Sequence, residues 1–442
     1  MTQQQKRILA LNAFEGGAAL DSDVADLVRR RQATFGASSV LFYRQPLHIV
    51  KAETCYIHTA DGRRYLDLYN NVPSVGHCHP RVVAAVSAQL AEFNTHSRYL
   101  YDNIHDYAER LLATFPAGLS NIVFTCTGSE SNDLALRLAR MASGASGFVV
   151  TRTAYHGNTA AVTDVSPSSA IAGGLAPHVR AVAAPGRAAH GDNIAMGFAQ
   201  AVSAAIKDLN DSGYGFAGLL VDSIFSSDGV FSDPAGFLGP AVQVAKDAGG
   251  LFIADEVQPG FGRTGGGMWG FARHGVMPDV VTMGKPMGNG YPIAGTVTRP
   301  DLLARLCDSY GYFNTFGATP AAAAAGLATL QVLQEEGLIE HAGRVGSYLK
   351  QGLAELRGSL PGIGEVRGTG LYLGLDIVDP DDGETPDGAG ASSLINALKE
   401  EGVLIGAAGP YGHTLKIRPP LCLQASDADR FIDALIRIGK KG

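Results

Sequence analysis

The chain has few of the features that mark secreted, membrane-spanning or nucleic-acid-binding proteins. Its five cysteines are scattered over 442 residues without a C-x-x-C pair, which argues against a disulfide framework and against a structural zinc. No run approaches the roughly 20 apolar residues of a membrane span, and the N-terminal stretch lacks the pattern of a secretory signal. The net charge of −7 argues against nucleic acid or an anionic membrane as the main partner. We therefore expect a cytoplasmic protein.

A length of 442 residues is too great for one ordinary core, so two or more domains are expected. The middle of the chain alternates short apolar runs with helix-like stretches. The expected strands are 122–126, 148–151, 218–222, 251–255, 279–283 and 293–297, and the expected helices include 129–142 and 320–337. Apolar runs without polar alternation are typical of strands covered on both faces. The pattern predicts a doubly wound, mainly parallel α/β domain over 80–315.

The two ends of the chain differ from this middle. Residues 40–75 show strand-like runs around a DG turn, and residues 345–442 mix helices with short strands at 369–377 and 414–419. We expect both ends to form one small α+β domain that closes a cleft against the large one. The boundaries expected on this basis are 1–79, 80–315 and 316–442. The polar stretch 376–392 is expected to be a surface loop.

Residues 255–265 (DEVQPGFGRTG) contain the G-x-G-x-x-G spacing of a dinucleotide-binding loop. That loop needs a helix directly after it, whose N-terminus meets the pyrophosphate. The following stretch, GGMWGFARHG, is too rich in glycine to favour a helix. No acidic residue follows at the ribose-binding spacing either. The dinucleotide interpretation is therefore set aside.

Residues able to do chemistry follow several of the expected strands, where ligands bind in open α/β sheets. They are Thr127-Gly128-Ser129 after 122–126, Tyr155 and His156 after 148–151, Asp255 at the end of 251–255, and Lys285 after 279–283. Small residues at a helix start suit a phosphate. A lysine for a Schiff base and a carboxylate for a pyridinium nitrogen complete the set that pyridoxal phosphate requires. Lys285, once released by an incoming amine, is placed to act as a general base.

With these residues the chain resembles the class III aminotransferases, which have the fold-type I architecture of pyridoxal-phosphate enzymes. The resemblance rests on DEVQPGFGRTG (255–265) and TMGKPMGNGYP (282–292) together, and it runs from about residue 40 to the end. In this family the glycine-rich loop folds over the cofactor and supports a dimer interface. The resemblance thus explains the glycines and implies a homodimer with shared active sites.

The resemblance also implies a role for individual residues. Lys285 would bind the cofactor covalently, Asp255 would bond the pyridine nitrogen, and Gln258 would reach the ring hydroxyl. Tyr155 would stack on the ring beside His156. Gly128 and Ser129 would bind the phosphate, and Thr315 would reach that phosphate from the other subunit. Three positions depart from the family pattern. Asp222-Ser223 replaces Glu-Pro, Gly317-Ala318-Thr319-Pro320 replaces Gly-Gly-Asn-Pro, and Ser131 replaces an alanine. The first change puts in doubt any substrate contact assigned to that glutamate.

The reaction is less closely defined than the cofactor. The stretches 70–80, 94–103, 268–279 and 409–421 resemble the branch that includes the ethanolamine-phosphate and hydroxylysine-phosphate phospho-lyases. A second phosphate would need cationic and hydrogen-bonding groups, and the candidates are Arg44, Asn71, His77, Arg98 and Arg418. A transaminase acting on an amino acid or ω-amine and a non-catalytic protein that binds pyridoxal phosphate remain alternatives. No metal site is expected, because His77 and His79 lack further ligands.

Overall fold

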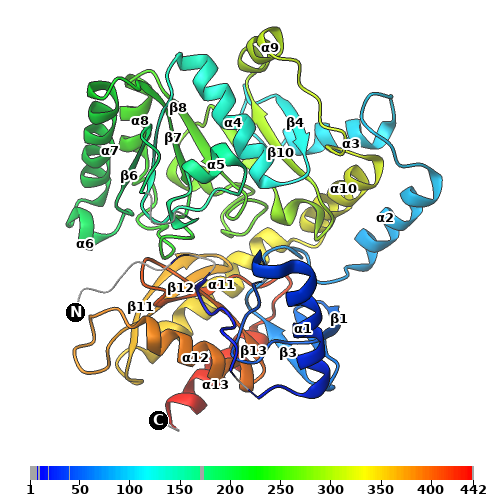
Figure 1. The fold of residues 1–442 in the computed structure, drawn as a ribbon, viewed down its shortest axis with the longest axis vertical. Helices are drawn as coiled ribbons and strands as arrows, with labels where there is room; N and C mark the ends of the chain where they lie inside the picture. The colour runs from blue at the N-terminus through cyan, green and yellow to red at the C-terminus, as the bar shows by residue number, and fades with distance from the viewer. Residues whose placement is uncertain (1–6, 8–9, 18, 39, 170–173, 441–442) are drawn as a thin grey trace.

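A computed structural model describes residues 7, 10–17, 19–38, 40–169 and 174–440. The chain forms a large α/β domain, in the upper half of Figure 1, and a smaller α+β domain below it. Among the described residues, no helix combines the length and the apolar character needed to cross a membrane.

The large domain is built on a seven-stranded sheet in the order β4-β10-β9-β8-β7-β5-β6. Its strands are β4 (Asn121–Thr125), β5 (Gly147–Thr151), β6 (Val179–Val182), β7 (Phe216–Asp222), β8 (Leu251–Asp255), β9 (Val280–Met283) and β10 (Ala294–Thr298). From β9 to β6 every pairing is parallel, and β10 runs antiparallel to both neighbours. The expected doubly wound, mainly parallel sheet is confirmed.

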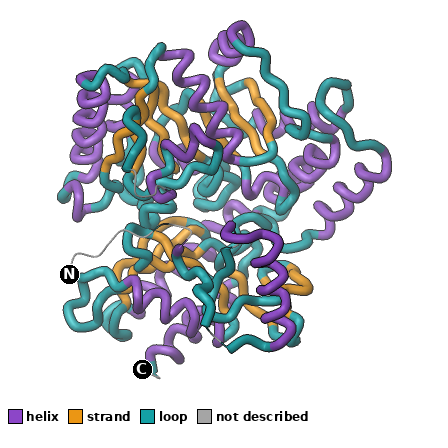
Figure 2. The backbone as a smooth tube through the Cα atoms, viewed as in Figure 1, coloured by secondary structure: helices purple, strands orange, loops and turns teal. Residues whose placement is uncertain are grey.

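Helices cover both faces of this sheet, as the tube in Figure 2 also shows. On one face Phe148 belongs to a cluster with Leu134 of α4 (Gly128–Ser143), and on the other Val149 belongs to the main core with Phe198 of α7 (Ile194–Asp211). The other helices of this part are α2 (Pro80–Glu92), α3 (Asp102–Leu112), α5 (Ala160–Asp164), α6 (Arg187–His190), α8 (Gly239–Asp247), α9 (Pro300–Ser309), α10 (Pro320–Glu335) and the 3-10 helices η3 (Pro167–Ser169), η4 (Gly270–His274) and η5 (Lys285–Gly288). Burial on two sides explains the continuous apolar strands.

The small domain contains two four-stranded sheets, ordered β1-β2-β3-β13 and β11-β12-β15-β14. Their strands are β1 (Ile49–Glu53), β2 (Tyr56–Thr59), β3 (Arg64–Asp67), β11 (Ile363–Thr369), β12 (Tyr372–Ile377), β13 (Val403–Leu404), β14 (Gly406–Ala408) and β15 (Thr414–Ile417). The helices are α1 (Ser22–Phe35), η2 (Gly36–Ser38), α11 (Leu338–Leu356), α12 (Gly388–Glu400) and α13 (Ala425–Gly439).

Both ends of the chain contribute to one of these sheets. Strand β13 pairs in parallel with β3, so that Val403 lies opposite Leu66. Figure 1 accordingly places β3 and α1 beside β13, α12 and α13. A small α+β domain built from both termini is therefore confirmed, whereas the exact boundaries 1–79, 80–315 and 316–442 stay predictions.

Several local expectations need correction. Helix α4 begins at Gly128, one residue before the expected 129, and Thr127 is its N-cap, since its side-chain oxygen accepts a hydrogen bond from the Glu130 N–H at 3.2 Å. The edge strand β6 (sequence VRAV) was not predicted, because Arg180 interrupts its apolar run. Helix α10 stops at Glu335, before the expected end at 337, and Gly337 (φ 61°) is instead the N-cap of α11. The expected loop 376–392 starts within β12 and runs into α12.

Candidate active site

The carboxyl ends of three neighbouring strands bring the expected chemistry together. Asp222 at the end of β7 lies opposite Asp255 at the end of β8, and Asp255 lies opposite Thr282 of β9. Lys285 begins η5 directly beyond β9. Because parallel strands all end at the same edge of the sheet, these side chains share one site.

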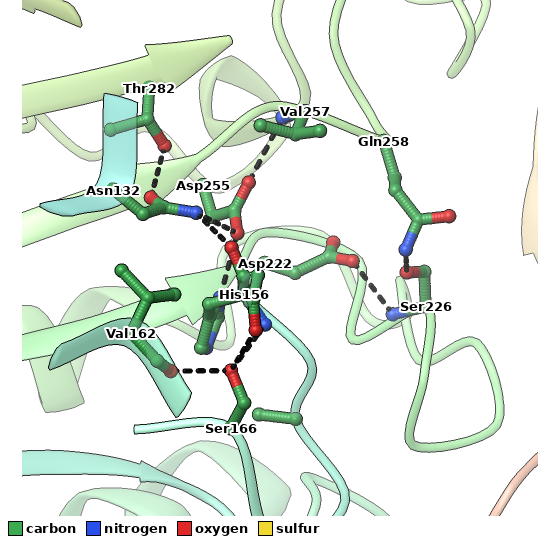
Figure 3. Close-up of polar contacts among 12 residues, drawn as sticks. Asn132, His156, Val162, Ser166, Asp222, Ser226, Asp255, Val257, Gln258 and Thr282 are labelled. Carbon is green, nitrogen blue, oxygen red and sulfur yellow. Dashed lines mark hydrogen bonds and ion pairs between the residues drawn. The ribbon is translucent and has the colours of Figure 1, made fainter. Parts of the chain in front are cut away.

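Asp255 is held by a hydrogen-bond network that Figure 3 shows in close-up. Its Oδ2 atom lies 2.7 Å from His156 Nδ1 and accepts a bond from Asn132 Nδ2 at 3.0 Å, and its Oδ1 atom accepts from the Val257 N–H at 3.0 Å. The side chain of Thr282 donates in turn to Asn132 Oδ1 at 2.7 Å. Asp255 is only 4% exposed, so these donors stand in for water and fix the direction of its carboxylate.

Close backbone packing marks the start of α4. A Cβ added to Gly157, which has φ +146°, would lie 2.5 Å from Ser129 Oγ, and one on Gly128 would lie 2.8 Å from Val257 Cγ2. The Ser129 hydroxyl also accepts a bond from the Asn158 N–H at 3.2 Å. The first N–H groups of a helix lack partners within it, so this start offers donors to an anion. The two glycines let Val257 and Ser129 pack closely against this helix start.

A cavity of about 170 Å³ opens beside Lys285. Its walls are formed by Leu11, Asn12, Phe42, Tyr69, Tyr155, Gln258, Lys285, Ile405, Gly406, Ala407, Lys416 and Arg418. The basic side chains among these residues are Lys285, Lys416 and Arg418, and none of the residues is acidic. The walls therefore favour an anionic occupant.

Burial, followed by the nearby Arg418 guanidinium, lowers the pKa of Lys285, and Asp255 and Asp222 counteract that effect in part. A lysine with a lowered pKa is neutral for more of the time, and only the neutral amine is a nucleophile or a base. The site thus prepares Lys285 for covalent chemistry.

Gln258 links the two sides of the site. Its Nε2 atom donates to Ser226 Oγ at 2.7 Å, and its Oε1 atom accepts from the Tyr372 hydroxyl at 2.9 Å and from Arg418 at 3.1 Å. Arg418 also donates to Asn71 Oδ1 at 2.9 Å. Gln258 is therefore fixed between the loop after β7 and the small domain.

The small domain holds Arg418 in place from several directions. The backbone N–H of Arg418 donates to the Leu68 carbonyl at 2.9 Å, and the Arg418 guanidinium lies 4.5 Å from the centre of the Tyr69 ring. The buried Arg263, from the glycine-rich loop, donates to the carbonyls of Pro419 and Leu371. The glycine-rich loop 255–265 thus positions the segment that carries Arg418.

Comparison with known proteins decides the family. The model of the class III aminotransferases matches residues 41–438, which is most of the chain.

The chain belongs to the class III aminotransferase family.

Individual relatives and solved structures agree with this assignment. A phospholyase from Arthrobacter, in complex with phosphoethanolamine, superposes with a TM-score of 0.90 at 41% identity, covering 93% of this chain and 98% of that one. The ethanolamine-phosphate phospho-lyase homolog 1 of Caenorhabditis elegans is 35% identical over 95% of both proteins. The mitochondrial alanine–glyoxylate aminotransferase 2 homolog 2 of Arabidopsis thaliana is 39% identical, over 93% of this chain and 87% of its own length.

Class III aminotransferases are pyridoxal-phosphate enzymes, and the geometry of this chain fits that cofactor. Asp255 offers a fixed carboxylate, Lys285 an amine with a lowered pKa, and the start of α4 offers backbone N–H groups to an anion. Tyr155 lines the cavity next to Lys285, and His156 lies directly on Asp255. The individual contacts of these residues with the cofactor remain predictions.

The unusual pair Asp222-Ser223 has a local role in this member of the family. The Asp222 carboxylate accepts bonds from the N–H groups of Ile224 at 3.0 Å and Ser226 at 3.1 Å, and burial raises its pKa to about 6. The Ser223 hydroxyl donates to Glu256 Oε1 at 2.7 Å. Asp222 therefore orders the loop that presents Ser226 to Gln258.

The predicted substrate residues do not all lie in one place. Arg418 lines the cavity and bonds directly to the buried Asn71. His77 Nε2 lies 2.7 Å from Asp67 Oδ2, and the exposed Arg44 donates to Ser393 Oγ at 3.4 Å. The exposed Arg98 lies 4.0 Å from the centre of the Phe313 ring. These last three are absent from the walls of the cavity, so a direct substrate contact by them stays a prediction without geometric support within this chain.

Several residues of the site were not predicted from the sequence. Asn132 orients Asp255, Tyr372 bonds Gln258, and Asn12 and Lys416 line the cavity. The alternation of Lys416 and Arg418 in TLKIRP was the available signal, since residues two apart on a strand share a face. Asn12 lies in the N-terminal segment, where its carbonyl accepts a hydrogen bond from the Tyr43 N–H. No sequence motif indicates this contact.

Proposed function

We propose that the chain is a phospho-lyase that removes phosphate and ammonia from a small phosphorylated amine such as phosphoethanolamine. The observation that carries this proposal is the cavity beside Lys285, whose wall residues include basic but no acidic side chains. An amine nitrogen could reach Lys285 while a phosphate lies against Arg418. The Arthrobacter structure with phosphoethanolamine and the Caenorhabditis relative support the same substrate class.

The residues of the chain divide the work of this reaction. Pyridoxal phosphate, when bound, supplies an electron-accepting ring that stabilises negative charge on the carbon next to the substrate nitrogen. Asp255 provides the fixed negative charge that keeps a ring nitrogen protonated, and Lys285 takes the proton from that carbon. Arg418 binds the phosphate and stabilises it as it takes the electron pair of the breaking C–O bond. Water then converts the remaining two-carbon fragment to aldehyde and ammonia.

Transamination is the second candidate, and the Arabidopsis relative named as an alanine–glyoxylate aminotransferase homolog supports it. In that reaction Arg418 would bind the carboxylate of an amino acid. A carboxylate carries a single charge, and Arg418 alone suffices to bind it in a bidentate manner. The additional Lys416 in the same cavity favours the phosphate.

One incubation separates these two reactions. Purified holoenzyme is given phosphoethanolamine without any keto acid, and phosphate and acetaldehyde are measured over many turnovers. Equal amounts of both products support the lyase. If no phosphate appears, while an unphosphorylated amino donor aminates pyruvate, the lyase proposal fails and the transaminase replaces it.

We also propose that two copies form a dimer with shared active sites. Exposed apolar side chains occur around the exposed Thr315, at Tyr310, Phe313 and Phe316. Two more, Tyr99 and Leu100, belong to the segment whose Arg98 lies over the Phe313 ring. Leu100 is 92% exposed, and contiguous patches of this kind mark protein interfaces. Sedimentation should show a dimer, and Leu100→Glu should shift it towards the monomer and weaken cofactor binding. A wild-type monomer with full cofactor affinity would contradict the proposal.

We propose the cytoplasm as the location, on the ground that all five cysteines are free. Fractionation of the source cells with an antibody against the chain tests this. Recovery of the chain in an organelle, as the name of the Arabidopsis relative implies for that protein, would overturn it.

A further inference from the structure

Two of the five cysteines are in contact, although they lie far apart in the sequence. Cys55 is in the turn between β1 and β2, and Cys422 lies between β15 and α13, near the end of the chain. Their sulfur atoms are 3.4 Å apart, and both thiols are free. The bond of a disulfide measures about 2.05 Å, so a small movement of the two side chains brings these sulfur atoms into bonding range.

The two thiols differ in how easily a reagent reaches them. Cys55 is 1% exposed, and its Sγ atom lies 3.8 Å from the Pro420 carbonyl oxygen. Cys422 is only partly buried. A Cβ on Gly76, where φ is +114°, would lie 3.1 Å from Cys422 Sγ, so the glycine leaves room for this sulfur atom. Cys422 is therefore the thiol that a small reagent meets first.

The contact between the thiols also makes them chemically unequal. The hydrogen bond from Cys55 lowers the pKa of Cys422, against the opposing effect of burial. The same contact, together with burial, raises the pKa of Cys55. Because the thiolate is the nucleophilic form of cysteine, Cys422 is the reactive member of the pair.

A buried cation lies beside the pair. Arg263 is 1% exposed, and its Nη2 atom has no hydrogen-bond partner within the described part of the chain. Burial lowers the pKa of Arg263 to about 10, and negative charge on Tyr372, Cys55 or Cys422 counteracts that effect. A cation near a cysteine stabilises its thiolate. Arg263 is therefore placed to support thiol chemistry at this pair.

The two cysteines belong to segments that meet at the substrate end of the active site. Cys422 is four residues after Arg418, whose guanidinium donates to Asn71 Oδ1 at 2.9 Å. Thr54, next to Cys55, exchanges backbone hydrogen bonds of 2.8 and 3.2 Å with His77, in the loop that also carries Asn71. A covalent bond between the sulfur atoms thus changes the spacing of segments whose side chains line up in the cavity.

We propose that Cys422 and Cys55 form a redox modification site, at which a hydroperoxide converts the two thiols into a disulfide and thereby lowers the activity of the enzyme. With hydrogen peroxide, the Cys422 sulfur attacks one oxygen, the O–O bond breaks, and water leaves behind a sulfenic acid. The Cys55 sulfur then attacks the Cys422 sulfur, and the departing hydroxide takes the Cys55 proton as a second water. Two thiols lose two electrons and two protons, and the peroxide is reduced to two molecules of water.

The disulfide acts on the geometry of the substrate end. When the sulfur atoms approach each other, the segment after Arg418 moves towards the turn between β1 and β2, while Arg263 holds the carbonyl of Pro419. A displacement of about 1 Å in a positioning group is enough to lower the rate about 100-fold. In a cytoplasmic protein such a disulfide is transient, because thiol reductants reverse it.

Mass spectrometry tests whether the bond forms. Reduced holoenzyme is treated with hydrogen peroxide, its remaining thiols are alkylated, and the chain is digested. We expect two peptides linked through Cys55 and Cys422, which dithiothreitol separates. The control Cys307→Ser, which removes an exposed cysteine of α9, should give the same linked pair. Absence of the linked pair from oxidised wild type overturns the proposal.

Two variants test the order of the steps. In Cys55→Ser the sulfenic acid on Cys422 has no thiol to react with, so dimedone, a reagent that captures sulfenic acids, should label Cys422. In Cys422→Ser the buried Cys55 should stay unlabelled. Label on Cys55, or none on Cys422, contradicts the roles assigned to the two thiols. Where circular dichroism shows that a serine variant does not fold, the alanine variant replaces it with the same expectations.

Activity shows whether the bond regulates the enzyme. The value of kcat/KM is measured before peroxide, after it and after dithiothreitol, in whichever of the two candidate reactions the reduced wild type catalyses. We expect a loss of about 10- to 100-fold in wild type and Cys307→Ser, recovery on reduction, and no loss in Cys55→Ser or Cys422→Ser. A similar loss in Cys422→Ser, or a linked wild type with full activity, overturns the regulatory role.

Discussion

The two ends of the active site are stabilised in opposite ways. At the cofactor end, Asp255 is surrounded by donors, and its partner Asn132 is itself fixed by a further bond to Thr282 (Figure 3). At the substrate end, the buried Nε atom of Arg418 lacks a hydrogen-bond partner among the described residues. The network around the Asp255 carboxylate is thus formed within the chain, whereas the Arg418 guanidinium keeps a donor for an anion.

The two ends also differ in how the chain builds them. The cofactor end comes from adjacent strands of one parallel sheet, β7 to β9, whose carboxyl ends meet by construction. The substrate end combines β15 with the N-terminal segment around Asn12, which are hundreds of residues apart. Chemistry common to a family can therefore stay with the sheet, while specificity varies in the small domain.

The most severe change is expected at Lys285. Lys285→Ala should lower kcat about 10⁴-fold or more, because both the covalent attachment and the base are lost. Borohydride reduction followed by mass spectrometry should attach pyridoxyl to the wild type and not to the variant. Lys246→Ala, on the surface, is the control. A variant that still gains the adduct at this site would refute the assignment.

Removal of the charge at the cofactor end ranks second. Asp255→Asn should lower kcat about 10²- to 10³-fold, as for the loss of a preorganised electrostatic group, with little change in KM. Asp301→Asn, on the surface, should leave both constants unchanged. Activity near the wild-type level in Asp255→Asn would mean that the network around this carboxylate is only structural.

A smaller effect, and one of a different kind, is expected at the substrate end. Arg418→Lys keeps the charge but loses the planar fork that reaches Asn71 and Gln258. KM for phosphoethanolamine should rise about 10- to 100-fold, and kcat less. Steady-state kinetics measure this, with Arg299→Lys as the control. An equal loss in kcat with constant KM would assign Arg418 to the cofactor end.

The smallest effect should come from the support of Asp255. Asn132→Ala removes one bond to the carboxylate and the bond to the His156 carbonyl at 2.8 Å. Cofactor affinity should fall about fivefold, which corresponds to roughly 1 kcal/mol. Titration of the apoenzyme with cofactor measures it. In Thr282→Val, which removes a bond one step further from Asp255, cofactor affinity should fall by less. A larger fall in Thr282→Val than in Asn132→Ala would contradict the proposed support of Asp255 by Asn132.

What could be predicted from the sequence follows the same division. The strand ends placed Asp255 and Lys285 correctly relative to each other, because each follows an apolar run in a parallel sheet. Motifs of this kind do not show how distant segments meet. Arg44 and His77 were plausible phosphate ligands by type, but the fold pairs them with Ser393 and Asp67. Lys416 was not predicted, although its spacing of two from Arg418 in TLKIRP was a signal that both line the same cavity.

The pairing of β3 with β13 has a consequence for biosynthesis. On the ribosome, Leu66 emerges early, but its partner Val403 is among the last residues to be made. At about 5–20 residues per second, the early strands wait on the order of tens of seconds with one edge of their sheet unpaired. The large sheet can meanwhile form, since its strands lie between these two segments. A polypeptide cut short before residue 403 would therefore contain the lysine and the carboxylate for its cofactor, yet expose an open β-edge prone to aggregation.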